Sequence, residues 1–92
     1  MTKYFAALYE PGPNWISGKP ISQQPLSDHV AYLTGLHQQD IVSMGGPFAD
    51  GQAGLVILAA EDQAQAAALI ARDPAVQSAI LTAEVREWRR IV

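Results

Sequence analysis

Hydrophobic positions along the chain fall into short apolar runs that predict three strands. Tyr4 to Tyr9 is rich in aromatic residues and mostly apolar on both faces. Ile41 to Met44 predicts a second strand, and Ala53 to Ala60 predicts a third. Residues 55–60 are apolar without interruption, so neither face of the third strand is patterned for water. Residues 14–25, after the first strand, have no clear period and predict a surface loop.

Two further segments predict helices. From Leu26 to Gln39 the apolar residues recur at helical spacing, and Ser27 is the expected N-cap. The second helix begins at Asp62, where Gln65 completes a capping-box pattern, and it continues through an alanine-rich stretch. It ends before Pro74, because proline disfavours helical geometry in the residue that precedes it.

The final segment fits two patterns. Leu81, Val85 and Trp88 follow helical spacing, whereas Leu81, Ala83 and Val85 alternate with polar residues as in a strand. The order of the preceding elements, β-α-β-β-α, favours the strand, since a fourth strand completes a split β-α-β sandwich. The sequence therefore predicts an α+β, ferredoxin-like βαββαβ fold with a four-stranded antiparallel sheet, in one domain over residues 1–92.

This fold leaves one face of the sheet without a cover. Both helices lie on the same face, while the first and third strands are apolar on both faces. Packing the open face against the same face of a second copy would bury it. We therefore expect a homodimer that forms through the sheet faces.

Composition narrows the range of partners and compartments. The chain has 92 residues, a formal net charge of −3 and no cysteine. An acidic chain lacks the basic footprint that nucleic-acid binding requires, and no apolar run approaches the roughly 20 residues needed to cross a bilayer. The chain opens without the pattern of a secretion signal. We expect a cytoplasmic protein that binds neither nucleic acid nor membrane.

The stretch between the second and third strands predicts one wall of a small-molecule pocket. Gly45 and Gly46 leave no side chain, so another group can come close to the backbone. Ser43 is expected to share a strand face with Ile41 and Gly45, and its hydroxyl could donate to a substrate oxygen. Ser43, Gly45, Gly46 and Pro47 are the candidate substrate-binding residues, and Asp50 is expected to be a turn residue.

Two residues could carry acid-base chemistry. His29 lies in the first turn of its helix, where it could act as a general base or simply form the solvated edge of the core. Asp73 either orients a catalytic group at the end of the second helix, or caps a short turn that begins with Pro74. Both helices pack on one sheet face, so His29 and Asp73 could meet.

The sequence offers no metal or cofactor motif. His29 and His37 are eight residues apart on one helix and do not converge on a metal ion. His37, near the end of that helix, is expected to have a structural role. Neither a phosphate-binding loop nor a dinucleotide fingerprint occurs, so we expect no metal and no cofactor.

Several motifs together resemble the YciI-like, or YCII-related, family. They are His29 with Tyr32-Leu33, the turn from Gly45 to Phe48 with Asp50-Gly51, Asp73-Pro74, and Trp88. Their order and spacing match the family from about Tyr4 to Trp88. The resemblance implies a dimeric α+β barrel with a pocket centred on a His-Asp pair, here His29 and Asp73. One activity in the family is dehydrochlorination of a chlorinated hydroxyhydroquinone, and related barrels include muconolactone isomerases.

These observations give three functional hypotheses. The first is a cofactor-independent enzyme for elimination or isomerisation of a small polar molecule, aromatic or lactone-like, with His29 as general acid or base and Asp73 as its orienting partner. The second is a non-catalytic binding or regulatory module that uses the same pocket. The third is a purely structural dimer, in which side chains would fill the space beside His29.

Overall fold

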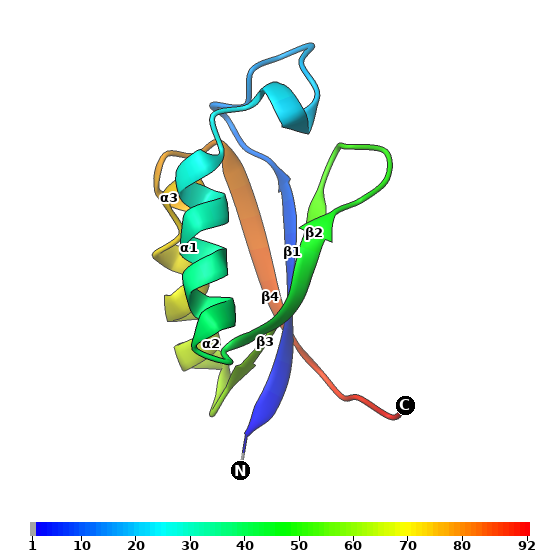
Figure 1. Cartoon of the computed structure of the whole chain (residues 1–92), viewed down its shortest axis with the longest axis vertical. Coiled ribbons are helices and arrows are strands. Elements are labelled where there is room, and N and C mark those ends of the chain that lie inside the picture. Colours follow the sequence, from blue (N-terminus) through cyan, green and yellow to red (C-terminus); the bar gives the residue numbers. More distant parts are fainter. Residues whose placement is uncertain (1) are drawn as a thin grey trace.

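Four strands and three α-helices make up residues 2–92, the part of the chain that the structure, a computed structural model, describes (Figure 1). In chain order the elements are β1 (Lys3–Pro11), the 3-10 turn η1 (Ile21–Gln23), α1 (Ser27–Gln38), β2 (Val42–Pro47), β3 (Gly54–Ala60), α2 (Gln63–Ala71), α3 (Pro74–Gln77) and β4 (Leu81–Trp88).

The strands form one antiparallel sheet in the order β2-β3-β1-β4. The final segment is the strand β4, which pairs with β1 from Tyr4 opposite Trp88 to Pro11 opposite Leu81. This register places the apolar Ala83 and Val85 opposite Tyr9 and Ala7. Pairing with β1, which is distant in the sequence, therefore decides between the helical and the strand pattern of this segment in favour of the strand. The predicted ferredoxin-like α+β fold is confirmed.

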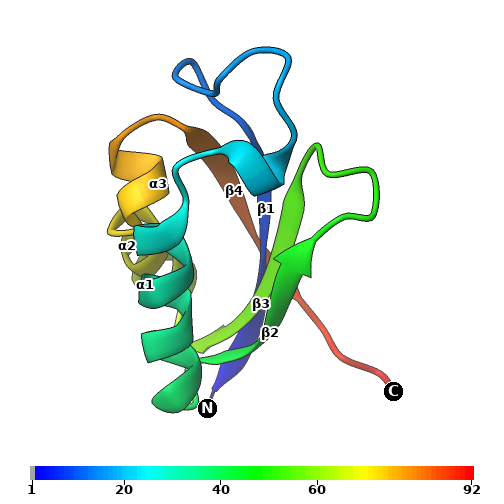
Figure 2. The same cartoon turned by 45° about the horizontal axis from the view of Figure 1, so that its top comes forward.

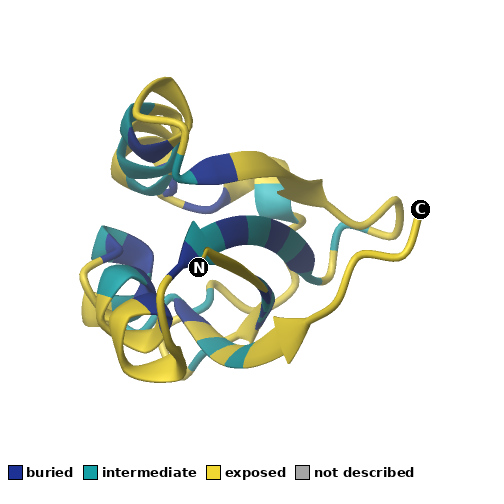
Figure 3. Cartoon of the chain, turned by 90° about the horizontal axis from the view of Figure 1, so that it is seen from below, coloured by how far each residue is buried: buried dark blue, intermediate teal, exposed yellow. Residues whose placement is uncertain are grey.

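All three α-helices cover the same face of the sheet, as Figure 2 shows. Alternate residues of the two central strands point to this face and form the core, because successive strand side chains point to opposite sides. Phe5 in β1 and Leu58 in β3 are fully buried, and each contributes about 2 kcal/mol through burial of apolar surface. Figure 3 shows the buried residues gathered between the helices and the sheet.

The two long helices begin differently. At α2 one half of the expected capping box is present, because the Gln65 backbone N–H donates to Asp62 Oδ1 at 2.8 Å. The Gln65 side chain accepts from the N–H of Glu61, one residue before the cap, instead of from Asp62. At α1 the prediction of Ser27 as N-cap is wrong. The carbonyl of the buried Leu26 accepts the first helical bond, from Val30, and makes Ser27 the first helical residue. Within residues 2–92, the helices are too short or too polar to span a membrane.

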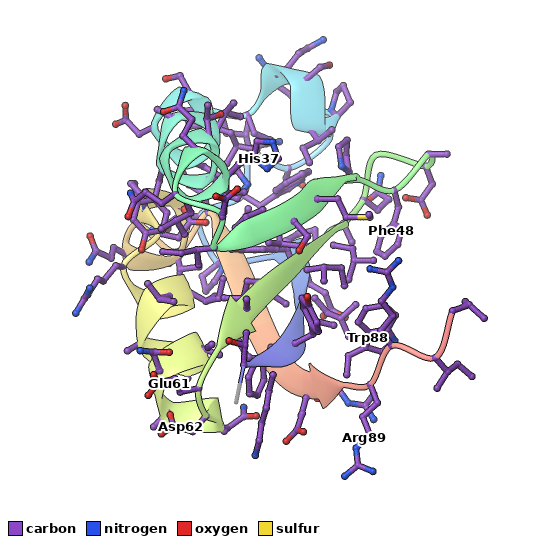
Figure 4. The ribbon with its side chains drawn as sticks, turned by 60° about the horizontal axis from the view of Figure 1, so that its bottom comes forward. His37, Phe48, Glu61, Asp62, Trp88 and Arg89 are labelled. Atoms are coloured by element: carbon purple, nitrogen blue, oxygen red, sulfur yellow. The ribbon has the colours of Figure 1, made fainter. Side chains whose placement is uncertain are left out.

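The opposite face of the sheet, called here the outer face, carries exposed apolar side chains. Leu8 pairs with Leu55 and Ala6 with Ile57 across β1 and β3 on this face. Met44 on β2 is 68% exposed. Figure 4 shows Phe48 and Trp88 on the side of the sheet away from the helices, and both side chains are exposed. The helices leave this surface open.

Candidate functional site

The Asp73 carboxylate lies at the centre of the site and joins three elements. It is fully buried at the start of α3. Its Oδ1 accepts a hydrogen bond from the Ala75 backbone N–H at 2.9 Å. Its Oδ2 lies 2.6 Å from His29 Nδ1 and accepts from the Tyr9 hydroxyl at 3.0 Å. The two alternatives for Asp73 are therefore compatible, because one oxygen caps α3 while the other holds the histidine.

His29 lies at the third position of α1, with its side chain 13% exposed. Because a carboxylate accepts hydrogen bonds, we assign the ring proton to Nδ1, which leaves the lone pair on Nε2. The Tyr9 ring packs edge-on against the imidazole, with 5.3 Å between ring centroids. The histidine is thus fixed on one side by the carboxylate and on another by the phenol ring.

Tyr9 is a member of the site that the sequence analysis missed. Burial, together with the adjacent Asp73 charge, raises the pKa of the Tyr9 hydroxyl well above its ordinary value. The hydroxyl therefore stays protonated and donates to the carboxylate. A sequence signal for it did exist. Tyr9 follows Phe5 and Ala7 at strand spacing, and a buried tyrosine hydroxyl usually finds a polar partner.

A cavity of about 990 Å³ lies beside His29, between α1 and β2. Figure 2 shows these two elements facing each other, with β3 between β2 and the rest of the sheet. One helical face forms the first wall. Its residues are Leu26, His29, Val30, Leu33, Thr34 and His37. The cavity is open rather than packed with side chains, which argues against the hypothesis of a purely structural dimer.

The four candidate substrate-binding residues all border this cavity. Ser43, Gly45, Gly46 and Pro47 lie along β2, opposite the wall that contains His29. Asp73 does not line the cavity and reaches it through the histidine. The structure thus brings the predicted residues to one place. Their contact with a substrate remains a prediction.

A register shift at Ser43 changes which β2 residues share a face. Val42 pairs with Leu58, but Met44 pairs with Ile57, so Ser43 is the extra residue of a bulge. The expectation that Ser43 shares a strand face with Ile41 and Gly45 is therefore wrong. Ile41 precedes the strand, and Val42 lies on the helix-facing side with Gly45.

The two central glycines differ in what surrounds them. A Cβ atom at Gly45 would lie 3.0 Å from Val56 Cγ2, so the missing side chain makes room for the neighbouring strand. At Gly46 a Cβ atom would meet nothing within 4 Å. Both glycines nevertheless line the cavity, and the close approach of a ligand to either of them stays a prediction.

Two residues outside the pair have structural contacts. His37 Nδ1 lies 2.8 Å from the Val42 carbonyl oxygen and ties the last turn of α1 to β2. Asp50 is a turn residue, as expected, because its Oδ1 accepts from the Gln52 backbone N–H at 2.9 Å. Over residues 2–92, no three His, Cys, Asp or Glu side chains gather as they would around a metal ion.

Comparison with known proteins defines the class of this domain. The family model of the YCII-related domain matches residues 4–89, and the chain belongs to that family. A curated relative, the uncharacterised protein YjpA of Bacillus subtilis, is 28% identical over 68 residues, which cover 74% of this chain and 80% of YjpA.

A solved structure has the same fold. It is the 5-chloro-2-hydroxyhydroquinone dehydrochlorinase TftG from Burkholderia phenoliruptrix, in complex with 2,5-dihydroxybenzoquinone. The match has a TM-score of 0.63 and covers 94% of both chains at 16% sequence identity. At this identity the likeness establishes a common fold.

Proposed function

We propose that this protein is a cofactor-independent enzyme that uses His29 and Asp73 for acid-base catalysis. The carrying observation is the 2.6 Å contact between His29 Nδ1 and Asp73 Oδ2 at the wall of the cavity. The family membership and the small-molecule chemistry named for TftG support this proposal. The reaction is elimination or isomerisation of a small polar molecule, aromatic or lactone-like.

Nε2 of His29 is the group that takes the substrate proton. Asp73 holds the ring in the tautomer that leaves Nε2 unprotonated, and its negative charge stabilises the imidazolium that forms. The electron pair left on the substrate either expels a leaving group, in elimination, or is protonated at another carbon, in isomerisation. In the second case the same imidazolium returns the proton.

The β2 wall supplies the groups that orient the substrate. The Ser43 hydroxyl donates to a substrate oxygen, and the backbone of Gly45, Gly46 and Pro47 forms the surface against which the substrate rests. β2 is an edge strand, so part of its backbone is not committed to a neighbouring strand. Such groups are suited to binding a polar substrate beside His29.

The functional unit of the proposal is a homodimer in the cytoplasm. The outer face carries the exposed Met44, Phe48 and Trp88. A second copy would bury this surface by using the same face twice. The absence of cysteine fits a reducing compartment. Light scattering after size-exclusion chromatography tests the assembly, and a stable monomer at micromolar concentration contradicts it.

The test of catalysis is replacement of His29. With 5-chloro-2-hydroxyhydroquinone as the elimination probe, chloride release by His29→Ala should fall by about 100-fold or more. Asp28→Ala is the matched control, because Asp28 is exposed in the same helical turn and does not line the cavity. Melting curves show whether each variant is folded. Equal turnover by the folded His29→Ala variant and the wild type would refute the role of His29.

A non-catalytic binding module is the second candidate, favoured by the size of the cavity and its largely aliphatic walls. It predicts that wild type binds small hydroxylated molecules but turns over none of them. His29→Ala would then change the dissociation constant without any change in product formation.

A further inference from the structure

We infer that the cavity selects an uncharged ligand, with an apolar body and a hydroxyl group that donates a hydrogen bond to Nε2 of His29. This inference rests on the proposed function, because it takes the cavity as the ligand site, and it narrows the ligand class. It follows from the chemistry of the walls, the state of the polar groups in them and the charge behind His29.

The walls suit an apolar molecular body. On the α1 side the aliphatic side chains of Leu26, Val30 and Leu33 face the cavity, and Val42 and Val56, which point to the helix-facing side of the sheet, border it on the sheet side. A pocket of this kind gains affinity by removing apolar ligand surface from water. The remaining lining groups are hydroxyl, amide, phenol and imidazole groups or backbone.

Several of these polar groups already have partners within the protein. Gln24 accepts from the Ile16 N–H at 2.8 Å and donates to the Ile16 and Lys19 carbonyls, so its amide holds the loop before α1. His37 is engaged by the Val42 carbonyl, and Tyr9 donates to Asp73. The side-chain polar groups that remain for a ligand are Nε2 of His29, Nε2 of His37 and four neutral hydroxyls: Ser22, Ser27, Thr34 and Ser43.

The charge near the cavity is negative. The buried Asp73 carboxylate lies directly behind His29, in contact with its ring. The six Lys and Arg residues of the chain lie outside the set that lines the cavity. An anionic ligand would therefore lose its hydration and gain only neutral hydroxyls close to the like charge of Asp73. This exchange makes the binding free energy of an anion unfavourable. A neutral hydroxyl avoids this cost and satisfies the Nε2 lone pair.

A matched pair of phenols tests the inference. Para-propylphenol and para-hydroxyphenylpropionate share the phenol and differ by a terminal methyl group against a carboxylate. Calorimetric titration of the full-length protein near neutral pH should give about tenfold tighter binding, or more, for para-propylphenol. Equal or tighter binding of the carboxylate would overturn the inference. So would a failure of para-propylphenol to bind at millimolar concentration.

Two arginine variants localise the effect to the cavity. Val30 borders the cavity and is 58% exposed, so Val30→Arg adds a cation at its mouth without loss of a buried side chain. The neighbouring Ala31 is exposed and does not line the cavity, so Ala31→Arg adds the same charge elsewhere. Val30→Arg should tighten carboxylate binding about fivefold or more, and Ala31→Arg should not. An equal effect of both variants would contradict the inferred site.

The outcome can be separated from that of the proposed function. Preferential binding of the neutral phenol, with no turnover of any substrate, would leave this inference intact and refute catalysis. Conversely, turnover of an anionic substrate that depends on His29, with binding that favours the carboxylate, would refute the inference and leave catalysis intact.

Discussion

Asp62 and Asp73 cap consecutive helices through the same kind of hydrogen bond, but they differ in burial and in their other contacts. Asp62 is exposed, and its side chain accepts from the backbone N–H of Gln65. Asp73 is fully buried, and it accepts from the N–H of Ala75 with one oxygen while the other holds Tyr9 and His29.

The difference shows how a local signal can carry a tertiary role. A capping aspartate is selected by the first turn of its own helix, whatever lies beyond it. At Asp73 the second carboxylate oxygen takes no part in capping the helix. Because this oxygen is buried, it needs hydrogen-bond donors from elsewhere in the protein. The site is therefore built from the unused half of a helix cap.

The largest expected effect comes from removing the cap at Asp73, and removal of the cap at Asp62 is the comparison. Asp73→Ala should cost about 3 kcal/mol of unfolding free energy, because it leaves the Tyr9 hydroxyl and His29 Nδ1 without their partner as well as the cap. Asp62→Ala should cost about 1 kcal/mol, the value of an exposed cap. Urea unfolding of both variants measures the difference, and equal losses would break the comparison.

A smaller effect is expected at Tyr9. Tyr9→Phe should cost about 1.5 kcal/mol near neutral pH, because it removes a hydrogen bond to a carboxylate. The cost of Asp73→Ala should then fall in the Tyr9→Phe background, since the hydroxyl no longer needs a partner. A double-mutant cycle measures this coupling. Strict additivity of the two variants would mean that the Tyr9 contact adds nothing to Asp73.

Alkaline pH tests the same contact without a change at Asp73. Since burial raises the pKa of Tyr9, the folded protein keeps a proton that the unfolded chain releases above its ordinary pKa of about 10. The contribution of this proton to the free energy of unfolding is fully present below about pH 10. Above about pH 10 it falls by about 1.4 kcal/mol per pH unit.

Tyr32 adds to this alkaline loss, because burial also raises its pKa. Tyrosine titrates between about pH 8 and pH 11. Over this range the free energy of unfolding should therefore decline more gently in Tyr9→Phe than in wild type. Tyr32→Phe serves as the comparison variant. A decline as steep in Tyr9→Phe as in wild type would contradict the assigned proton.

The smallest effect concerns the far end of α3. Ala79 follows this helix with φ of 59°, a left-handed conformation that glycine adopts more easily. Ala79→Gly should stabilise the protein by about 0.5 kcal/mol. It should leave the cost of Asp73→Ala unchanged, because that cost arises from tertiary partners rather than from the helix. A rescue by Ala79→Gly would assign the cost to α3 itself.

The sequence could predict whatever depends on near neighbours. The strands, the helices and both aspartate caps follow from residues within a few positions, and β4 follows once the order of elements is considered. The 2.6 Å contact between His29 and Asp73 joins residues 44 positions apart, and only the family resemblance implied it. The bulge at Ser43 depends on how β2 pairs with β3, which local pattern does not encode.

The role of Tyr9 and the packing reason for a glycine at position 45 could not be predicted from the sequence, for the same physical reason. The partner of Tyr9 lies 64 positions away, at the N-cap of α3. Gly45 makes room for Val56 of the adjacent strand, a neighbour that is known only once the register is fixed. In both cases the residue type is explained by a contact that the chain makes after folding.

The bridge formed by Asp73 also has a consequence for the order of synthesis. Tyr9 and His29 are made early, whereas Asp73, 64 residues after Tyr9, and the strand β4 that pairs with β1 come from the last part of the chain. A nascent or truncated chain that stops before residue 73 therefore exposes His29 without the carboxylate that orients it. The site is assembled only when translation of the domain is almost finished, so an unfinished copy has no organised acid-base centre.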